Sequence, residues 1–420
     1  MTRLKIFRTF LPIAASSAFI ASVSVAAGDT EEWKLEFAKS LGGAVPTAVD
    51  ICGLNAVVGN SSSLGAAMIV QRSASGPWMD GVSLQRPSNV SLFGFSVAID
   101  GDVAIVGGPG SGGRAAIYER AATGEWSEGL VLANPGGGSQ FGYAVDIEEG
   151  IALVGAPQGG AAGRAHVFEQ APNGEWLPVQ VLAGSGGQAV NFGSSVAISA
   201  GLALVGAPSG TSGRAELFRR DSSGIWNTEQ IFTYPGLPQL GTAVGIDADT
   251  VVVGAPVAAG RAVVWERLKG GDWDAGTLLP GGSNLFGTAV AIGNDRILIG
   301  APSPGAGGAV GFKRAGDGSW ILEANLPALG FGSQLGQSVA IDGDQAMVGA
   351  NGAFGIYRQA GCPGEDCIAD LNCDGIVDGG DLSILLGDWG LTDSPANISG
   401  KGPVNGADLA LLLSDWGLCP

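Results

Sequence analysis

The sequence predicts an all-β fold, a ring of seven four-stranded sheets of the β-propeller type, followed by a small α-helical C-terminal domain. Three observations predict the ring. A unit of about 50 residues recurs along most of the chain, each unit holds short apolar runs of strand length, and a Trp opens the last run of the unit. A period of this length with four strands per unit is typical of propeller blades.

Residues 141–176 illustrate the unit. Strand-like runs at 143–147, 151–155 and 164–169 are separated by small turn residues, and Trp176 opens a fourth run at 177–182. Other copies repeat a Phe-Gly or Leu-Gly pair before the first run, Gly-Ala-Pro or a variant after the second, and Gly-Arg-Ala at the third. A degenerate first copy, in which residues 47–51 match 143–147, brings the number to seven. The glycines of the first pair are Gly94, Gly142, Gly193, Gly241, Gly287 and Gly336.

These motifs resemble FG-GAP repeats, the blade unit of integrin α-subunit heads and of many bacterial secreted proteins. The resemblance covers roughly residues 30–360, so we assign residues 28–360 to the propeller. It implies the fold and leaves the function open, because a fold is a scaffold on which different sites are built.

Residues 1–27 predict a secretory signal. Arg3, Lys5 and Arg8 precede an apolar run at 10–25, and small residues allow cleavage near Ala27. The alternative is a membrane anchor, but the run is short for a bilayer span of roughly 20 residues and Pro12 interrupts it. We therefore expect a secreted or cell-surface protein without a membrane span in the mature chain.

The composition excludes some partners. The formal net charge is −18, and loss of the basic leader makes the mature chain more acidic. Such a chain does not attract phosphate backbones or anionic lipids, so we expect no nucleic-acid partner and a soluble monomer. Charged residues make up only 14% and Gly accounts for 73 residues, as expected of a turn-rich β protein.

The Trp positions predict how the ring closes. The first of them, Trp33, precedes the first three-strand core, whereas the last core has no Trp run after it. The N-terminal strand is therefore expected to complete the last blade, which leaves no open sheet edge between the two ends. We interpret these side chains as packing between sheets. They are Trp33, Trp78, Trp126, Trp176, Trp226, Trp273 and Trp320.

Two repeated polar features have competing interpretations. One residue position carries an Arg in four successive units. Either these arginines form a basic rim for binding or each pairs with a local partner, and we favour local pairing. Acidic turns at 100–102, 247–249 and 342–344 are similar to calcium loops of integrin blades, but they lack the full spacing and fit hairpin turns, so we expect no calcium there. The four arginines are Arg114, Arg164, Arg214 and Arg261.

Catalytic motifs give little support for an enzyme. The single histidine, His166, lies in a strand-like run, and no Gly-x-Ser-x-Gly or His-Glu-x-x-His motif is present. We therefore predict no catalytic residue. A pair of carboxylates meeting across the channel could still hydrolyse a glycoside, and the sequence leaves that open.

Residues 361–420 form a separate module. Residues 370–381 match a twelve-residue calcium loop, with oxygen-bearing side chains at loop positions 1, 3, 5, 9 and 12 and Gly375 at the turn. The pattern recurs at 397–408, and an apolar helical run follows each loop. In the second loop Lys401 replaces an oxygen donor, so we expect one Ca²⁺ per chain. Its expected ligands are Asp370, Asn372, Asp374, the Ile376 carbonyl, Asp378 and Asp381.

The duplicated loop and helix resemble a type I dockerin. The resemblance implies attachment through residues 362–420 to an extracellular, cohesin-like protein partner. Export permits disulfides among the four clustered cysteines, for which three pairings exist. Of these we choose Cys362–Cys419 with Cys367–Cys373, and we expect Cys52 to remain a thiol.

The sequence thus favours a secreted, non-catalytic binding or scaffold protein. The alternative is a polysaccharide-degrading enzyme, a glycosidase or lyase on the propeller, because dockerins often accompany such enzymes. A third interpretation, from the resemblance to integrin heads, is a surface adhesion protein.

Overall fold

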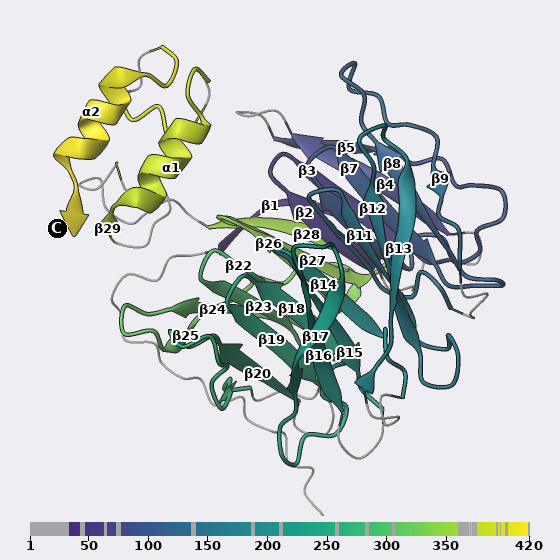
Figure 1. The fold of residues 1–420 in the computed structure, drawn as a ribbon. Helices are drawn as coiled ribbons and strands as arrows, with labels where there is room; N and C mark the ends of the chain where they lie inside the picture. Colours follow the sequence, from purple (N-terminus) through teal and green to yellow (C-terminus); the bar gives the residue numbers. More distant parts are fainter. Residues whose placement is uncertain are drawn as a thin grey trace, which may run out of the picture.

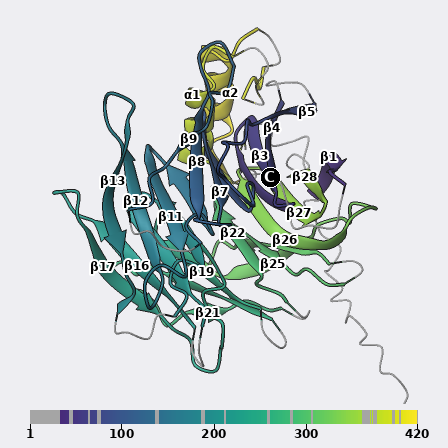
Figure 2. The same ribbon diagram turned by 90° about the vertical axis from the view of Figure 1, so that its right-hand side faces the viewer.

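The computed structural model describes residues 33–42, 47–62, 65–72, 77–135, 140–185, 190–209, 213–256, 260–281, 285–304, 307–359, 369, 371, 376–391, 394, 396–399 and 402–418. Seven four-stranded antiparallel sheets follow one another along the chain, which confirms the seven-bladed propeller. Figures 1 and 2 show them in chain order from purple to green, with two short helices in yellow.

Each blade has four strands, from the channel outwards. The innermost strands of blades 1 to 7 are β2 (Thr47–Cys52), β6 (Ser96–Asp100), β10 (Val145–Glu148), β14 (Ser195–Ser199), β18 (Ala243–Asp247), β22 (Ala289–Gly293) and β26 (Ser333–Asp342). The second strands are β3 (Asn55–Asn60), β7 (Val103–Gly108), β11 (Ile151–Ala156), β15 (Leu202–Ala207), β19 (Thr250–Ala255), β23 (Arg296–Gly300) and β27 (Gln345–Asn351). The third strands are β4 (Ala66–Arg72), β8 (Arg114–Glu119), β12 (Arg164–Gln170), β16 (Arg214–Arg220), β20 (Arg261–Glu266), β24 (Ala309–Arg314) and β28 (Ala353–Gln359). The outer strands are β5 (Trp78–Ser83), β9 (Leu130–Val131), β13 (Trp176–Leu182), β17 (Trp226–Phe232), β21 (Thr277–Leu278), β25 (Trp320–Asn325) and, in blade 7, β1 (Trp33–Ser40).

The core lies between neighbouring blades. Strands such as β15 are buried along their whole length, which explains their continuous apolar sequence instead of an alternating one. Leu204 and Leu217 of blade 4 share one cluster with Val251 and Val253 of blade 5. Each blade therefore needs both of its neighbours to bury its two faces.

The repeated glycines of the two sequence motifs meet at these contacts. Gly142, at φ +86°, ends the Phe-Gly pair of blade 3, and its carbonyl oxygen faces Gly107 at the end of β7 in blade 2. A Cβ on Gly107 would lie only 2.2 Å from that oxygen. Neither position tolerates a side chain, which explains why both glycines recur in nearly every unit.

The outer strand is shorter than expected in two blades. Trp126 and Trp273 form only isolated bridges, and the regular pairing of β9 and β21 begins several residues later. In blade 2, Gly129 lies against the ring of Tyr118, where a Cβ would be 2.5 Å from the phenol oxygen. In blade 5, Gly276 lies in the same way against Trp265. In both blades a ring of the third strand thus lies directly beneath a glycine of the segment that precedes the short outer strand.

Several outer-strand tryptophans also bind a carboxylate of the preceding blade. Trp176 Nε1 donates to Glu119 at 3.0 Å, and Trp320 Nε1 donates to Glu266 at 2.8 Å. Arg314 of the third strand pairs with the same Glu266 at 2.9 Å and lies 4.8 Å from the centre of the Trp320 ring. The indole thus packs between blades and also links them through its N–H.

Blade 7 combines the two ends of the propeller. Strand β1 pairs antiparallel with β28, from Trp33 opposite Gln359 to Ser40 opposite Ala353, and the purple and green strands lie together in both views (Figures 1 and 2). Trp33 is 4% exposed, and its Nε1 donates to Glu323 of blade 6 at 3.2 Å. It therefore makes the same kind of contact as Trp176, Trp273 and Trp320.

The described part of the C-terminal module holds helices α1 (Gly379–Gly387) and α2 (Gly406–Ser414) and a small ladder of β29 (Ile376–Val377) with β30 (Gly417–Leu418). Val377, Leu385, Val404 and Leu412 form its core. Both helices begin three residues earlier than the apolar runs suggest, because Asp378 and Asn405 act as N-caps within capping boxes. No helix within the described ranges has the length and apolar character that a membrane span requires.

Candidate functional site

The central channel is the first candidate site. A cavity of about 410 Å³ is lined by the innermost strands of all seven blades. Most of its lining is Val, Ala, Ile and Gly, so carboxylates on these strands stand out. Asp50 of β2 and Asp146 of β10 occupy the same strand position, where the other five blades have Ala98, Ala197, Gly245, Ala291 and Ala340.

Asp50 links blade 1 to blade 2. Its Oδ2 accepts a hydrogen bond from the backbone N–H of Ile99 at 2.8 Å. Burial raises the pKa of Asp50 to about 7, although N–H donors from Ile99 and Ile51 act in the opposite direction, and the charges of Asp342 and Asp100 raise it further. Near neutral pH this carboxyl is therefore divided between its acid and its anion.

Asp146 repeats the arrangement between blades 3 and 4. Its Oδ2 accepts from Ile198 N–H at 2.7 Å, and its Oδ1 accepts from its own neighbour Ile147 at 2.9 Å. Burial raises the pKa of Asp146 to about 8, and the charge of Asp50 is the next cause. Sequence analysis missed both residues. The available signal was an Asp inside an apolar run where most copies have Ala or Gly.

One rim of the channel carries a second set of acids, in the turns between first and second strands. The acidic turns at 100–102, 247–249 and 342–344 are hairpin turns, as expected. Asp100 Oδ2 accepts from Glu149 N–H of the next blade at 2.7 Å, and Asp342 Oδ2 accepts from Gly53 N–H at 2.6 Å. Glu148 accepts from Ala200 N–H at 2.7 Å in the same way. These acids tie neighbouring hairpins together.

The four repeated arginines each begin a third strand. Arg114 donates to the carbonyls of Gly112 at 2.7 Å and Gly113 at 2.8 Å, and Arg261 donates to Gly260 at 2.7 Å. Arg214 forms an ion pair with the buried Glu216 at 2.7 Å and also donates to the Ser185 carbonyl. Arg164 is exposed. Three of the four thus have local partners.

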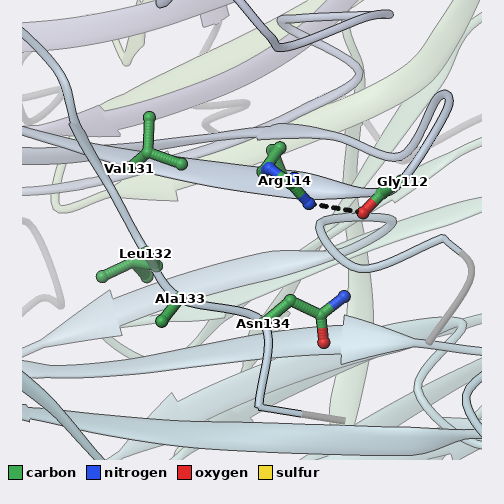
Figure 3. Close-up of a pocket in the computed structure, with 6 residues that line it drawn as sticks. All are labelled: Gly112, Arg114, Val131, Leu132, Ala133 and Asn134. Carbon is green, nitrogen blue, oxygen red and sulfur yellow. Dashed lines mark hydrogen bonds between the residues drawn. The ribbon is translucent and has the colours of Figure 1, made fainter. Parts of the chain in front are cut away.

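Arg114 also borders an open pocket of about 450 Å³ (Figure 3). Val131, Leu132 and Ala133 of the outer segment form its apolar wall, and Asn134 lies at its edge. The guanidinium turns back to the Gly112 carbonyl instead of pointing into open space. The pocket therefore offers a shallow, mixed surface and no convergent set of polar groups.

His166 is buried in β12, with 1% of its surface exposed. Its ring packs edge-on against Phe141, with ring centres 5.2 Å apart. Burial lowers the pKa of His166 to about 4, and the nearby charge of Arg164 adds to this effect. Neither ring nitrogen has a hydrogen-bond partner among the described residues. A buried, neutral imidazole of this kind is a packing side chain.

The first loop of the C-terminal module is the second candidate site. Of its expected ligands, Asp370, Asn372 and Asp374 lie outside the described residues. Asp378 caps helix α1 through Gly380 N–H at 2.7 Å. The fully buried Asp381 accepts from Leu371 N–H at 2.6 Å and from Asp378 N–H at 2.8 Å, so it joins the two ends of the loop. Ile376 lies in β29.

The second loop closes in a similar way. Asp408 is fully buried and accepts from Ser399 N–H at 2.8 Å and from Asn405 N–H at 2.9 Å. The Ser399 N–H is the main cause that lowers the pKa of Asp408. Asn397 donates across the loop to the Gly402 carbonyl at 2.9 Å. Lys401 and the cysteines Cys362, Cys367, Cys373 and Cys419 lie outside the described residues. Cys52 is a free thiol.

Comparison with known proteins supports the fold alone. No family model matches the chain, and no curated protein does. Among solved structures, the chain is similar to hydrazine synthase from Kuenenia stuttgartiensis, with 13% identity, a TM-score of 0.54, and coverage of 77% of this chain and 97% of that one. It also matches the computationally designed protein Ika8, with 15% identity, a TM-score of 0.48, and coverage of 77% and 99%. The first similarity agrees with a propeller and says nothing about chemistry.

Proposed function

We propose that this chain is a secreted binding or scaffold protein, whose propeller has FG-GAP-type blades and whose C-terminal dockerin-like module attaches it to an extracellular partner. One observation carries the scaffold part of the proposal. The two channel carboxylates, Asp50 and Asp146, each accept a hydrogen bond from a backbone N–H of the neighbouring blade. Side chains used in this way hold a ring together, and the buried His166 offers no general base beside them.

Attachment through the C-terminal module depends on calcium in this proposal. Asp370, Asn372, Asp374, Asp378, Asp381 and the Ile376 carbonyl would hold the ion as hard oxygen ligands, and the bound ion would order the loop. The contacts of Asp381 support such a site. Asp381 already draws the loop start to the helix start, and each carboxylate oxygen can accept more than one contact.

A calcium-dependent binding experiment tests the attachment. The full mature chain is immobilised and exposed to extracellular protein of the source organism, with calcium or with a chelator. We expect a discrete partner to bind with calcium only and to be lost in the Asp370→Ala, Asp374→Ala double variant. Asp102→Asn, on an exposed propeller turn, is the matched control and should bind normally. Equal capture with and without calcium would refute the attachment role.

The alternative function, a polysaccharide-degrading enzyme, is favoured by one observation. Two carboxyls with raised pKa values face a single channel, and perturbed acids of this kind cluster at active sites. The assay measures release of reducing sugars from a panel of plant and algal polysaccharides. Activity that disappears in both Asp50→Asn and Asp146→Asn would replace the scaffold proposal with a glycosidase or lyase.

A further inference from the structure

The innermost strands of neighbouring blades meet at seven seams, and side chains bridge most of them. At three seams the bridge is a serine hydroxyl that donates to a carbonyl of the next blade. Ser96 reaches Gly142 at 3.0 Å, Ser195 reaches Gly241 at 2.8 Å, and Ser338 reaches Thr47 at 2.5 Å. These contacts bridge seams 2–3, 4–5 and 7–1.

At two further seams the bridge is an aspartate. Asp50 accepts from Ile99 across seam 1–2, and Asp146 accepts from Ile198 across seam 3–4. No blade has both the serine bridge and the aspartate bridge. The blades with Asp have Ala48 and Ala144 at the serine position, and the blades with Ser have Ala98, Ala197 and Ala340 at the aspartate position. Five seams thus have one inner bridge each.

Seams 5–6 and 6–7 have neither device. Blade 5 has Ala243 and Gly245 at the two positions, and blade 6 has Ala289 and Ala291, so no polar side-chain atom is available there. The turn acid is also missing from blade 6, where Gly293 stands in place of the acid that Asp100 supplies in blade 2. In agreement, all five residues of β22 are partly exposed, whereas β14 has three buried residues.

The outer part of blade 6, in contrast, is fixed on both sides. Glu266 of blade 5 binds Trp320 at 2.8 Å and Arg314 at 2.9 Å. On the other side, Glu323 accepts from Trp33 at 3.2 Å and from Gln359 at 3.2 Å. Blade 6 is therefore held at its periphery on both sides. At the channel, Asp247 of blade 5 accepts the backbone N–H of Asn294 across seam 5–6, whereas none of these inner side-chain bridges crosses seam 6–7 among the described residues.

We propose that blade 6 is the moving segment of the ring: its inner edge separates from blade 7 about the fixed outer contacts and opens the central channel from the side. This makes blade 6 a gate to the cavity that Asp50 and Asp146 face. The inference does not depend on the proposed function, because it concerns access to the channel, whatever enters it.

Hydrogen exchange of the full chain, followed by mass spectrometry, tests the gate. We expect peptides from residues 289–300 of blade 6 to exchange faster than the equivalent residues 195–206 of blade 4, because local opening limits protection. Ala289→Ser would restore a bridge. The Cβ of Ala289 lies 3.3 Å from the place that a Cβ on Gly300 would take, and this place faces the Gly336 carbonyl. Ser96 has the same position in blade 2, beside Gly107 and opposite the Gly142 carbonyl. One added hydrogen bond should slow exchange in 289–300 by about fivefold.

Two variants serve as controls. Ser195→Ala removes the bridge of seam 4–5 and should speed exchange in 195–206 by a similar factor. Ala144→Ser adds a hydroxyl at seam 3–4, which Asp146 already bridges, and should change exchange there much less. Equal protection of blades 4 and 6 in the wild type would overturn the proposal. So would an Ala289→Ser variant that folds normally and leaves exchange in blade 6 unchanged.

Discussion

Replacing Asp146 by Asn should make the protein more stable at alkaline pH and leave its stability near pH 4 almost unchanged. Burial raises the pKa of Asp146 to about 8 and that of Asp50 to about 7, from an ordinary value of 3.8. A raised pKa means that the folded state holds the proton more tightly than the unfolded chain does. The stabilising contribution is therefore complete below about pH 4 and is lost as the pH rises through about 7 and 8.

The size of the effect follows from these shifts. A change of about 4 units at Asp146 corresponds to about 6 kcal/mol of unfolding free energy before screening by solvent, at about 1.4 kcal/mol per unit. Channel water screens both partly exposed groups, so we expect about 2 kcal/mol for each. Asn keeps a carbonyl oxygen that can accept the N–H of Ile198, and it does not ionise. The Asp146→Asn variant should thus gain about 2 kcal/mol over the wild type at pH 9.

Urea unfolding of the full chain at pH 4 and pH 9 measures the difference. Comparing variant with wild type at each pH cancels the titration of all other groups. Asp102→Asn is the matched control, because Asp102 is an exposed turn residue that pairs with Arg120 at 3.4 Å. The reasoning fails if Asp146→Asn shifts stability equally at both pH values, or if the variant is less stable than the wild type at pH 9.

Three further predictions concern other parts of the chain. Deleting residues 28–41 should lower the thermal unfolding midpoint, because blade 7 loses strand β1, and an unchanged midpoint would contradict this. Trp33→Phe should cost about 1 kcal/mol in urea unfolding, because Glu323 loses a donor, whereas Trp126→Phe, whose indole N–H has no partner among the described residues, should cost less. Calorimetric titration of the full chain should give one calcium per chain, lost in Asp370→Ala with Asp374→Ala, and a stoichiometry of two would refute the ranking of the loops.

The propeller could be predicted from sequence because its determinants are local and repeated. The position of Gly142 requires a positive φ, and the position of Gly107 has no room for a Cβ. A glycine therefore recurs at each position about every 50 residues. The hairpin turns follow from their Asp and Gly residues in the same way. The short outer strands of blades 2 and 5 could not be foreseen, because the sequence does not show that Tyr118 and Trp265 lie beneath a glycine.

The two channel aspartates could not be predicted for a different reason. Asp50 and Asp146 bind backbone groups about 50 residues away, in the next blade, and backbone N–H groups leave no trace in sequence. The same holds for Glu119 and Glu266, whose indole partners belong to another repeat. The apolar runs suggest starts for α1 and α2 that are too late, because the helices begin at the caps Asp378 and Asn405, inside the loops.

The pairing of β1 with β28 has a consequence for the order of events during synthesis. Strand β1 is among the first segments of the chain to be made, and its partner at residues 353–359 is made some 300 residues later. Until then, Trp33 cannot reach its place between blades 6 and 7. Completion of the ring therefore requires a very long-range contact. It should be a late, slow step, because closing so large a loop costs entropy before the pairing of the strands can offset that cost. If the secreted chain proposed above is exported unfolded, this delay is an advantage, because the ring cannot close before its last strand arrives.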